Sequence, residues 1–308
     1  MTRLVVAGFV AVTLLGCDHD DAREAFDPFA QSARNEAIAD TACPKVTAPY
    51  FFRIEKDSKT SYLLGTRHIG VAWSKMPPMV HDALDNAKLV VFETVANDGS
   101  DETPAPFKPA RDELGPKVWK RYRELAGDAL ADAMQNAAPT TAMIMLMITY
   151  EDRLSALERE ITLQAKVLDK PMRGLETSAF QHELIDKYTD GRAARRYIEH
   201  LDSVDELRQD TIEDLRKFCS GTLEEPGVGP DDRKDMLDSG YTEAEIATMD
   251  REMLFDRNHS WIPPLETILA DGDAFIVVGA DHTRGDQGVP ALLTAEGYTV
   301  VRVTPPAK

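Results

Sequence analysis

Short apolar runs of strand length lie at both ends of the chain and a long helical stretch lies between them, and this arrangement constrains the fold most. Four to eight branched or aromatic residues bounded by turn residues are typical of a buried strand. Helical segments are expected at 80–87 and 289–296, so strands and helices alternate at each end. We therefore predict an α/β fold with a central mixed sheet and flanking helices. The expected strands are a hairpin at 50–54 and 61–65, then 88–93, 274–279 and 299–303.

The middle of the chain, from about 117 to 262, has the periodicity of helices. Apolar residues recur three and four positions apart over five segments: 117–136, 142–168, 179–188, 193–218 and 243–262. A short strand with a turn is expected at 170–177, and 221–240, with four glycines and two prolines, is expected to be a loop. We interpret the helical middle as an insertion into, or a cap over, a single α/β domain spanning 48–304.

The N-terminus has the dimensions of a signal peptide. Arg3 precedes a 13-residue apolar run, which is too short to span a bilayer. The run ends in Leu-Leu-Gly-Cys at 14–17, which resembles a bacterial lipoprotein signal; the alternative is an ordinary secretory signal in which Cys17 is incidental. The resemblance implies that residues 1–16 are removed, that Cys17 is lipidated and that 17–47 are a polar tether. It places the protein in the bacterial cell envelope, anchored to a membrane and facing the periplasm or the cell surface. Whether the membrane is the inner or the outer one is left open.

The charge of the chain argues against one class of partner. Asp and Glu total 53 against 35 Lys and Arg, which gives a net charge of −18. An acidic protein without a compensating basic patch repels phosphates, so we expect no nucleic-acid partner. The expected partners are a peptide or small-molecule substrate and, through the lipid anchor, a membrane. The oligomeric state is left open.

Two further cysteines, Cys43 and Cys219, remain after Cys17. An oxidising compartment permits a disulfide between them, and the alternative is a pair of inert thiols. The sequence has no Cys-x-x-Cys or Cys-x-x-His pair, so we do not expect a thiolate metal site.

Residues that can bind a metal or move a proton stand at or just after the ends of four of the expected strands. They are His68, Glu93, Glu176 and His282, and a glycine stands three residues before each histidine. The carboxyl ends of parallel strands converge on one crevice, so neighbouring strands would bring two imidazoles and two carboxylates together. Taken singly, each histidine could be structural, and each glutamate could pair with an arginine.

These residues lie in motifs that resemble a known family. YLLGTRHIG, VVFET, GLET, DRNHSW and FIVVGADHTRGDQGVPALLTAEGYTVVRV occur in this order and are similar to the motifs of the TraB/GumN (TraB–PrgY–TIKI) family. The similarity covers about 48–304. It implies a fold like those of erythromycin esterase and the ChaN haem-binding lipoprotein. It also implies the activity of the animal members, which are proteases dependent on manganese- or cobalt-type ions.

The resemblance assigns roles to particular residues. His68, His282 and Glu93 would bind Mn, Co or Zn, and nitrogen and oxygen ligands suit these ions. Glu176, or a further carboxylate such as Asp281, would accept a proton. Arg257 would stabilise an oxyanion or, alternatively, form a salt bridge with Glu93 or Glu176.

The expected function is thus a lipid-anchored metal-dependent hydrolase of the peptidase type. One alternative is a non-catalytic lipoprotein that binds a peptide, a metal or haem. Another is a metal-free, esterase-like hydrolase in which His68 is the general base.

Overall fold

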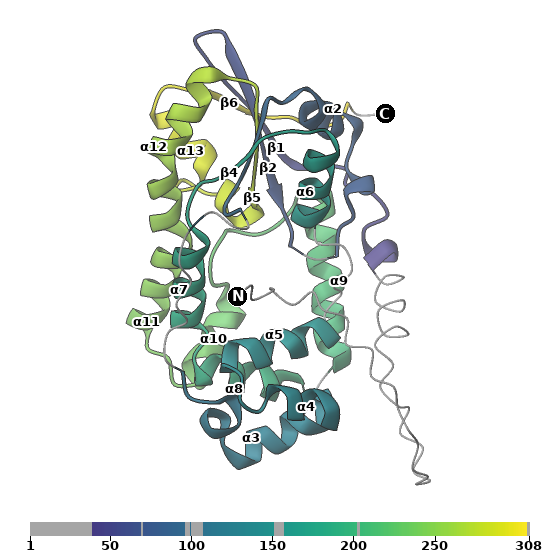
Figure 1. Cartoon of the computed structure of the whole chain (residues 1–308), viewed down its shortest axis with the longest axis vertical. Helices are drawn as coiled ribbons and strands as arrows, with labels where there is room; N and C mark the ends of the chain where they lie inside the picture. The colour runs from purple at the N-terminus through teal and green to yellow at the C-terminus, as the bar shows by residue number, and fades with distance from the viewer. Residues whose placement is uncertain are drawn as a thin grey trace.

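A mixed sheet with the strand order β4-β3-β5-β2-β1-β6 forms the frame of the described part of the chain. The computed structural model describes residues 39–68, 70–95, 99, 107–150, 157–201 and 204–306 (Figure 1). The strands are β1 (Tyr50–Lys56), β2 (Lys59–Thr66), β3 (Leu89–Phe92), β4 (Met172–Gly174), β5 (Ala274–Gly279) and β6 (Thr299–Arg302). The α/β fold with a mixed sheet that the sequence predicts is therefore confirmed.

The register of the sheet brings four strand ends to one edge. β1 and β2 form an antiparallel hairpin, and Asp57 and Ser58 at its tip have positive φ angles of 50° and 62°, as a two-residue hairpin turn requires. β2 pairs with β5, β5 with β3, and β3 with β4, all in parallel. The central strands are buried on both faces, as in β5, where every residue is buried. The carboxyl ends of β2, β3, β4 and β5 consequently share one edge.

Helices cover both faces of the sheet. Figure 1 shows α12 and α13 on one side and α2 and α6 on the other. Side chains of all four helices belong to the same buried core as the strands, and residues of α9 join it as well. The bounds are α2 (Pro78–Asn86), α6 (Leu157–Val167), α9 (Val204–Ser220), α12 (Asp256–Asp271) and α13 (Val289–Ala295), with the short turns η1 (Trp73–Lys75) and η4 (Ala280–Thr283).

The helical middle of the chain has a hydrophobic core of its own. Trp119, Tyr122, Leu146 and Ile198 are among its buried side chains, and the ring centroids of Trp119 and Tyr122 are 4.9 Å apart. This core lies away from the sheet, at the opposite end of the molecule in Figure 1. It is built by α3 (Ala110–Ala126), α4 (Asp128–Met134), α5 (Pro139–Tyr150) and α8 (Gly191–His200).

The connection back to the sheet contains a helix that the sequence did not predict. α7 (Ser178–Tyr188) leads from β4 to the helical core, and α9, α10 (Pro230–Asp238), α11 (Glu243–Asp250) and the π-helical turn η3 (Arg251–Phe255) lead back from it to α12. The expectation of a loop over 221–240 is wrong for α10. Pro230 occupies the first turn of α10, where its fixed φ and missing N–H favour a helix, and Met236 packs into a small core with Tyr241 and Ile246.

Helix boundaries also differ from the predicted ones. The segment predicted as one helix over 117–136 is divided at Gly127, which has a φ of 77°. The segment 193–218 spans two helices, α8 and α9. Part of the segment 142–168, residues 151–156, lies outside the described residues.

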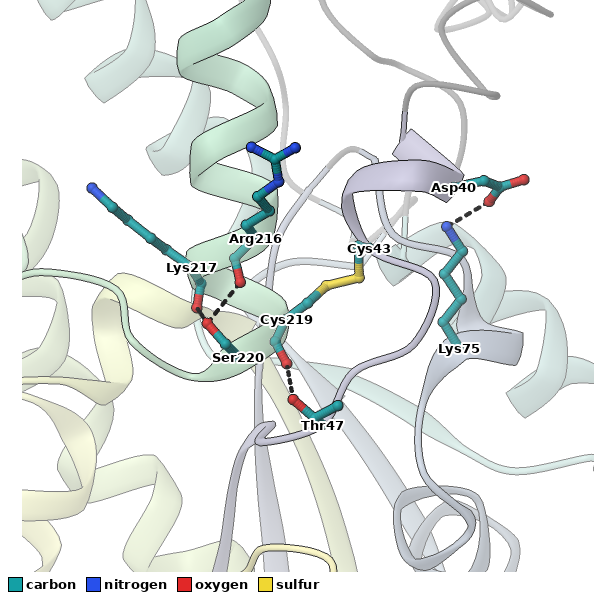
Figure 2. Close-up of a disulfide and its surroundings, with 8 residues drawn as sticks. All are labelled: Asp40, Cys43, Thr47, Lys75, Arg216, Lys217, Cys219 and Ser220. Carbon is teal, nitrogen blue, oxygen red and sulfur yellow. Dashed lines mark hydrogen bonds and ion pairs between the residues drawn. A yellow bond between two sulfur atoms is a disulfide. The ribbon is translucent and has the colours of Figure 1, made fainter.

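The residues just before β1 belong to the body of the protein. We expected a tether up to residue 47, but Ala39, Ala42 and Val46 are buried in the sheet core. Cys43 forms a disulfide with Cys219 at the end of α9, with 5.9 Å between the Cα atoms (Figure 2). The N–H and the hydroxyl of Thr47 both donate to the Cys219 carbonyl, at 2.8 and 3.1 Å. This segment is therefore fixed to α9 by a covalent bond and by hydrogen bonds.

The predicted signal peptide, Cys17 and the tether up to residue 38 lie outside the described residues. In the part of the chain that is described, no helix has the length and apolar character needed to cross a membrane.

Candidate active site

The four predicted strand-end residues lie at one edge of the sheet, and three of them, Glu93, Glu176 and His282, contact one arginine. His68 follows β2, Glu93 follows β3, Glu176 lies two residues beyond β4, and His282 is in η4 directly after β5. Arg257, in the first turn of α12, reaches between them. The parallel register of the strands explains why residues distant in sequence meet at this edge of the sheet.

Arg257 forms ion pairs with both glutamates in a buried setting. Its Nη2 lies 2.7 Å from Glu93 Oε2 and 2.7 Å from Glu176 Oε1, and its Nε lies 3.1 Å from each oxygen of Glu176. The three side chains are only 7%, 14% and 6% exposed, in the order Arg257, Glu93, Glu176. The third nitrogen, Nη1, donates to the Met253 carbonyl at 3.0 Å. Of the two roles considered for Arg257, the salt-bridging one is present in the structure, and the oxyanion role stays a prediction.

The π-helical turn η3 sets the position of Arg257. It lies between α11 and α12 and contains Met253, whose carbonyl accepts from the guanidinium. A π-turn adds a residue to the helical repeat and shifts the side chains that follow, and such turns are frequent at functional sites. One turn further along α12, the Trp261 Nε1–H donates to Glu176 Oε2 at 2.9 Å. Glu176 is therefore held from two positions of the same helix.

Glu93 is an ionised, fully hydrogen-bonded carboxylate. Gly279 N–H donates to its Oε1 at 2.7 Å, and Gln181 Nε2 donates to its Oε2 at 3.0 Å. Burial opposes the ionisation of Glu93, but its electrostatic interactions with His282 and with the Arg257 guanidinium, and the hydrogen bond from the Gly279 N–H, outweigh burial and lower its pKa.

His282 is buried and held in one tautomer. Its Nδ1 lies 2.6 Å from Asn258 Oδ1, and the amide nitrogen of Asn258 donates to the Gln287 carbonyl, which fixes the orientation of the amide. Since an amide oxygen can only accept, Nδ1 carries the proton and Nε2 presents a lone pair. This Nε2 lies 3.3 Å from Arg257 Nη1 and 3.8 Å from Glu93 Oε1. Burial lowers the pKa of His282 to about 4, so the ring is neutral at neutral pH.

His68 is held by a residue that sequence reasoning missed, Glu158. The His68 Nδ1 lies 2.9 Å from Glu158 Oε1, and the Thr66 hydroxyl donates to the same oxygen. This hydrogen bond, together with the charge of Glu158, raises the pKa of His68 to about 9. Glu158 is in the first turn of α6, within a predicted helix and far from any strand end. Nothing in the sequence distinguished it from a solvated glutamate.

Gly279 marks the point at which the predicted ligands meet. A methyl group on its Cα would lie 3.4 Å from Glu93 Oε1, 3.5 Å from His282 Cδ2 and 3.8 Å from His68 Nε2. The three side chains thus surround one small space, and a residue without a side chain leaves that space open.

The chemistry of these residues fits a divalent metal. Each histidine has an acceptor on Nδ1, which leaves Nε2 as the potential ligand, and this outer-shell arrangement is typical of metal-binding histidines. Two imidazole nitrogens and one carboxylate are a donor set that suits Mn, Co or Zn. Among the residues described, however, no three His, Cys, Asp or Glu side chains are grouped closely enough to hold an ion, and the Arg257 guanidinium lies beside Glu93 and His282. The metal set His68, His282 and Glu93 therefore stays a prediction.

A cleft of about 580 Å³ opens at this edge of the sheet. His68, His282 and Gly279 line one part of it, whereas Glu93, Glu176 and Arg257 do not line it and lie behind them. The other walls come from α8, α9, α10, α11 and η3 and from the loop between α9 and α10. They are rich in apolar side chains: Phe218, Leu223, Val228, Met236, Met249, Met253 and Leu254. The cleft has room for a peptide segment or a small molecule next to the two histidines.

Comparison with known proteins gives one match. A family model described as the TraB/PrgY/gumN family matches residues 50–302, which include every strand of the sheet and the whole of the site described above. Neither the search of curated proteins nor that of solved structures found a match.

Proposed function

The chain belongs to the TraB/PrgY/gumN family, and from this premise and the geometry of the site we propose that it is a metal-dependent peptidase. The observation that carries the proposal is the convergence of His68 Nε2, His282 and Glu93 Oε1 around Gly279 in the wall of the cleft. In both histidines Nδ1 is bonded to an acceptor, so Nε2 is the nitrogen that faces the other predicted ligands; in His282 this Nε2 also lies 3.3 Å from Arg257 Nη1. Such an arrangement suits metal binding better than a purely structural role.

The side chains of the site have different proposed roles. His68, His282 and Glu93 would hold the ion, which when bound polarises a carbonyl and lowers the pKa of water. Arg257 keeps Glu93 ionised and in place through its ion pair. Glu176 has both oxygens bonded to Arg257 and Trp261 and does not line the cleft. We therefore assign Glu176 to holding Arg257 and not to accepting a proton from water.

The walls of the cleft indicate where the substrate lies. Three of the apolar wall residues are methionines, Met236, Met249 and Met253, whose flexible side chains adapt to different shapes. We propose that they contact apolar side chains of a peptide whose scissile carbonyl lies at Gly279.

A metal-free hydrolase is the second candidate, and the contact between Glu158 and His68 favours it. A histidine whose Nδ1 is bonded to a carboxylate can act as a general base through Nε2. Because the pKa of His68 is raised to about 9, such an enzyme would be most active in alkaline solution.

Metal content tests the proposal directly. The full-length protein is equilibrated separately with Mn, Co and Zn, and the bound metal is measured by mass spectrometry for wild type, His68→Ala and His282→Ala. His259→Ala, an exposed histidine of α12, is the matched control. We expect about one ion per chain in wild type and in the control, and loss in the other two variants. A folded wild-type protein that binds none of the three ions would contradict the metal-dependent mechanism.

Peptide cleavage separates the remaining alternatives. Cleavage that chelation abolishes supports the metallopeptidase. Cleavage that withstands chelation supports the metal-free hydrolase, and metal binding without turnover of any peptide supports a binding protein.

We also propose that the protein is a lipoprotein of the bacterial cell envelope, anchored through Cys17. The support is the Leu-Leu-Gly-Cys sequence at 14–17 after an apolar run. In bacterial cells fed a labelled fatty acid, the wild-type protein is expected to carry the label and to sediment with membranes. Cys17→Ser is expected to lose both properties, and a labelled variant would contradict the assignment.

A further inference from the structure

The segment that follows β2 contains His68 and is hydrogen-bonded to the first turn of α6. This turn supplies two carboxylates to the segment. Glu158 accepts from the Thr66 hydroxyl and lies 2.9 Å from His68 Nδ1. Glu160 Oε2 accepts the Trp73 N–H at 2.6 Å. Glu158 therefore binds Thr66 and His68 at the end of β2, and Glu160 binds Trp73 at the start of η1.

The helix that supplies these acids is itself fixed. Leu157, Ile161 and Ala165 of α6 have no exposed surface and belong to the sheet core. A carboxylate on a packed helix keeps its position better than one on a loop, and a rigid second layer is what holds a reactive group in place. Glu158 therefore has the support that a positioning residue needs.

His68 depends on such support because its side chain is 72% exposed. An exposed imidazole changes rotamer freely unless a partner holds it. The Thr66 hydroxyl has a second acceptor, the Val278 carbonyl at 3.1 Å, so Thr66 would stay in place without Glu158. Among the contacts of the described residues, the contact with Glu158 is the one that fixes the orientation of the His68 ring, with Nε2 facing Gly279.

We propose that Glu158 is the positioning residue of His68: it holds the proton on Nδ1 and directs Nε2 toward Glu93 and His282. This inference concerns the orientation and tautomer of one ring, and only its consequence for metal binding rests on the proposed function. Outer-shell partners of metal-binding histidines contribute about 10- to 100-fold to affinity. We expect a loss of that size when Glu158 is removed.

The test uses three variants of the full-length chain. Glu158→Ala removes the acceptor. Glu158→Gln keeps an oxygen that can accept from Nδ1–H but removes the charge. Glu160→Gln is the matched control, since it changes a carboxylate of the same helix turn that binds Trp73 N–H and not His68.

The first readout is nuclear magnetic resonance of ¹⁵N-histidine-labelled protein, with the His68 signals identified by their absence in His68→Ala. Spectra are recorded with rising pH until the ring is neutral or the protein unfolds. We expect the Nδ1 proton to persist in wild type, Glu158→Gln and Glu160→Gln. In Glu158→Ala the neutral ring is expected to shift to the Nε2–H form that free imidazole side chains favour. An unchanged Nδ1 proton in folded Glu158→Ala would overturn the proposal.

The second readout is the affinity for Mn, Co and Zn. A 10- to 100-fold loss in Glu158→Ala, a smaller loss in Glu158→Gln and none in Glu160→Gln is the expected order. Equal losses of affinity in Glu158→Ala and Glu160→Gln would show that metal binding depends on holding the whole segment in place. This result would overturn the proposal that Glu158 positions the His68 ring. If the tautomer changes as expected but wild type binds no metal, the proposed function fails and the assignment of Glu158 stands.

Discussion

Replacing Arg257 by methionine is expected to destabilise the protein strongly at neutral pH. The substitution keeps the length of the side chain but leaves Glu93 and Glu176, which are 14% and 6% exposed, without the cation between them. Breaking a buried ion pair by removing one partner costs about 3–5 kcal/mol. A change of 1 kcal/mol shifts the melting temperature of a domain of this size by about 2–4 °C, so we expect a decrease of roughly 6–20 °C.

The loss should depend on pH with a defined sign. In wild type the pKa of Glu93 is lowered, so the stability that its ionised form contributes is present above the unfolded-state pKa and is lost as pH falls through the lower folded value. Without Arg257, burial raises the pKa of Glu93, and the carboxyl can take up a proton in mildly acidic solution. The difference in stability between the two proteins should therefore shrink as pH falls from 7.5 to 5.

Thermal unfolding followed by circular dichroism at both pH values measures this difference. Two further variants act as controls. Arg257→Lys keeps the charge and should lose less stability, and adding Glu176→Gln to Arg257→Met should restore part of the loss, since it removes one of the unpaired charges. If Arg257→Met loses less than about 1 kcal/mol, or if its deficit is the same at both pH values, the carboxylates are not held by Arg257 in the way described.

Three other predictions follow from the structure. Cys43→Ser should destabilise the protein by about 2–5 kcal/mol, because the disulfide closes a loop of 176 residues, and urea unfolding with and without reductant measures this loss; unchanged unfolding on reduction would contradict the estimate. Gly279→Ala should fold normally, since the added methyl meets its neighbours at ordinary contact distances of 3.4 to 3.8 Å, but it should fill the space between the predicted ligands and abolish metal uptake in the mass-spectrometric assay. Because the pKa of His68 is raised to about 9, metal must displace its proton at lower pH, so the affinity measured by calorimetry should fall about tenfold per pH unit below 9; an affinity independent of pH between 6 and 8 would exclude His68 as a ligand.

The residues at the strand ends were predictable because two independent signals coincide there. Buried strands such as 274–279 are visible as apolar runs, and the carboxyl ends of parallel strands converge whatever the rest of the chain does. His68, Glu93, Glu176 and His282 all follow such runs, and the structure brings all four to one edge of the sheet.

The role of Glu158 and the existence of α10 could not be predicted from the sequence, and the reasons differ. Glu158 lies on a helix, and its role comes from a tertiary contact between α6 and the segment after β2, which local periodicity does not encode. In 221–240 the glycines and prolines hide a short helix, because Pro230 stands at its first turn, where proline favours a helix instead of breaking one.

Residues 39–46 pack against the body of the protein, and the sequence did not predict this either. Their composition is that of a linker, but the disulfide of Cys43 fixes them to α9, and a constraint between positions 176 residues apart cannot be read from the local sequence.

The same disulfide has a consequence for how the cleft can move. Phe218, next to Cys219 on α9, lines the cleft together with the two histidines, and Cys43 lies seven residues before β1 of the sheet that carries them. The disulfide thus joins the end of α9 to the segment that leads into the sheet, and this bond limits how far that end of α9 can move away from the sheet. For the peptidase proposed above, a cleft of limited aperture would favour an extended stretch of polypeptide over a folded domain. The width of the cleft would then select among substrates before any substrate side chain is recognised.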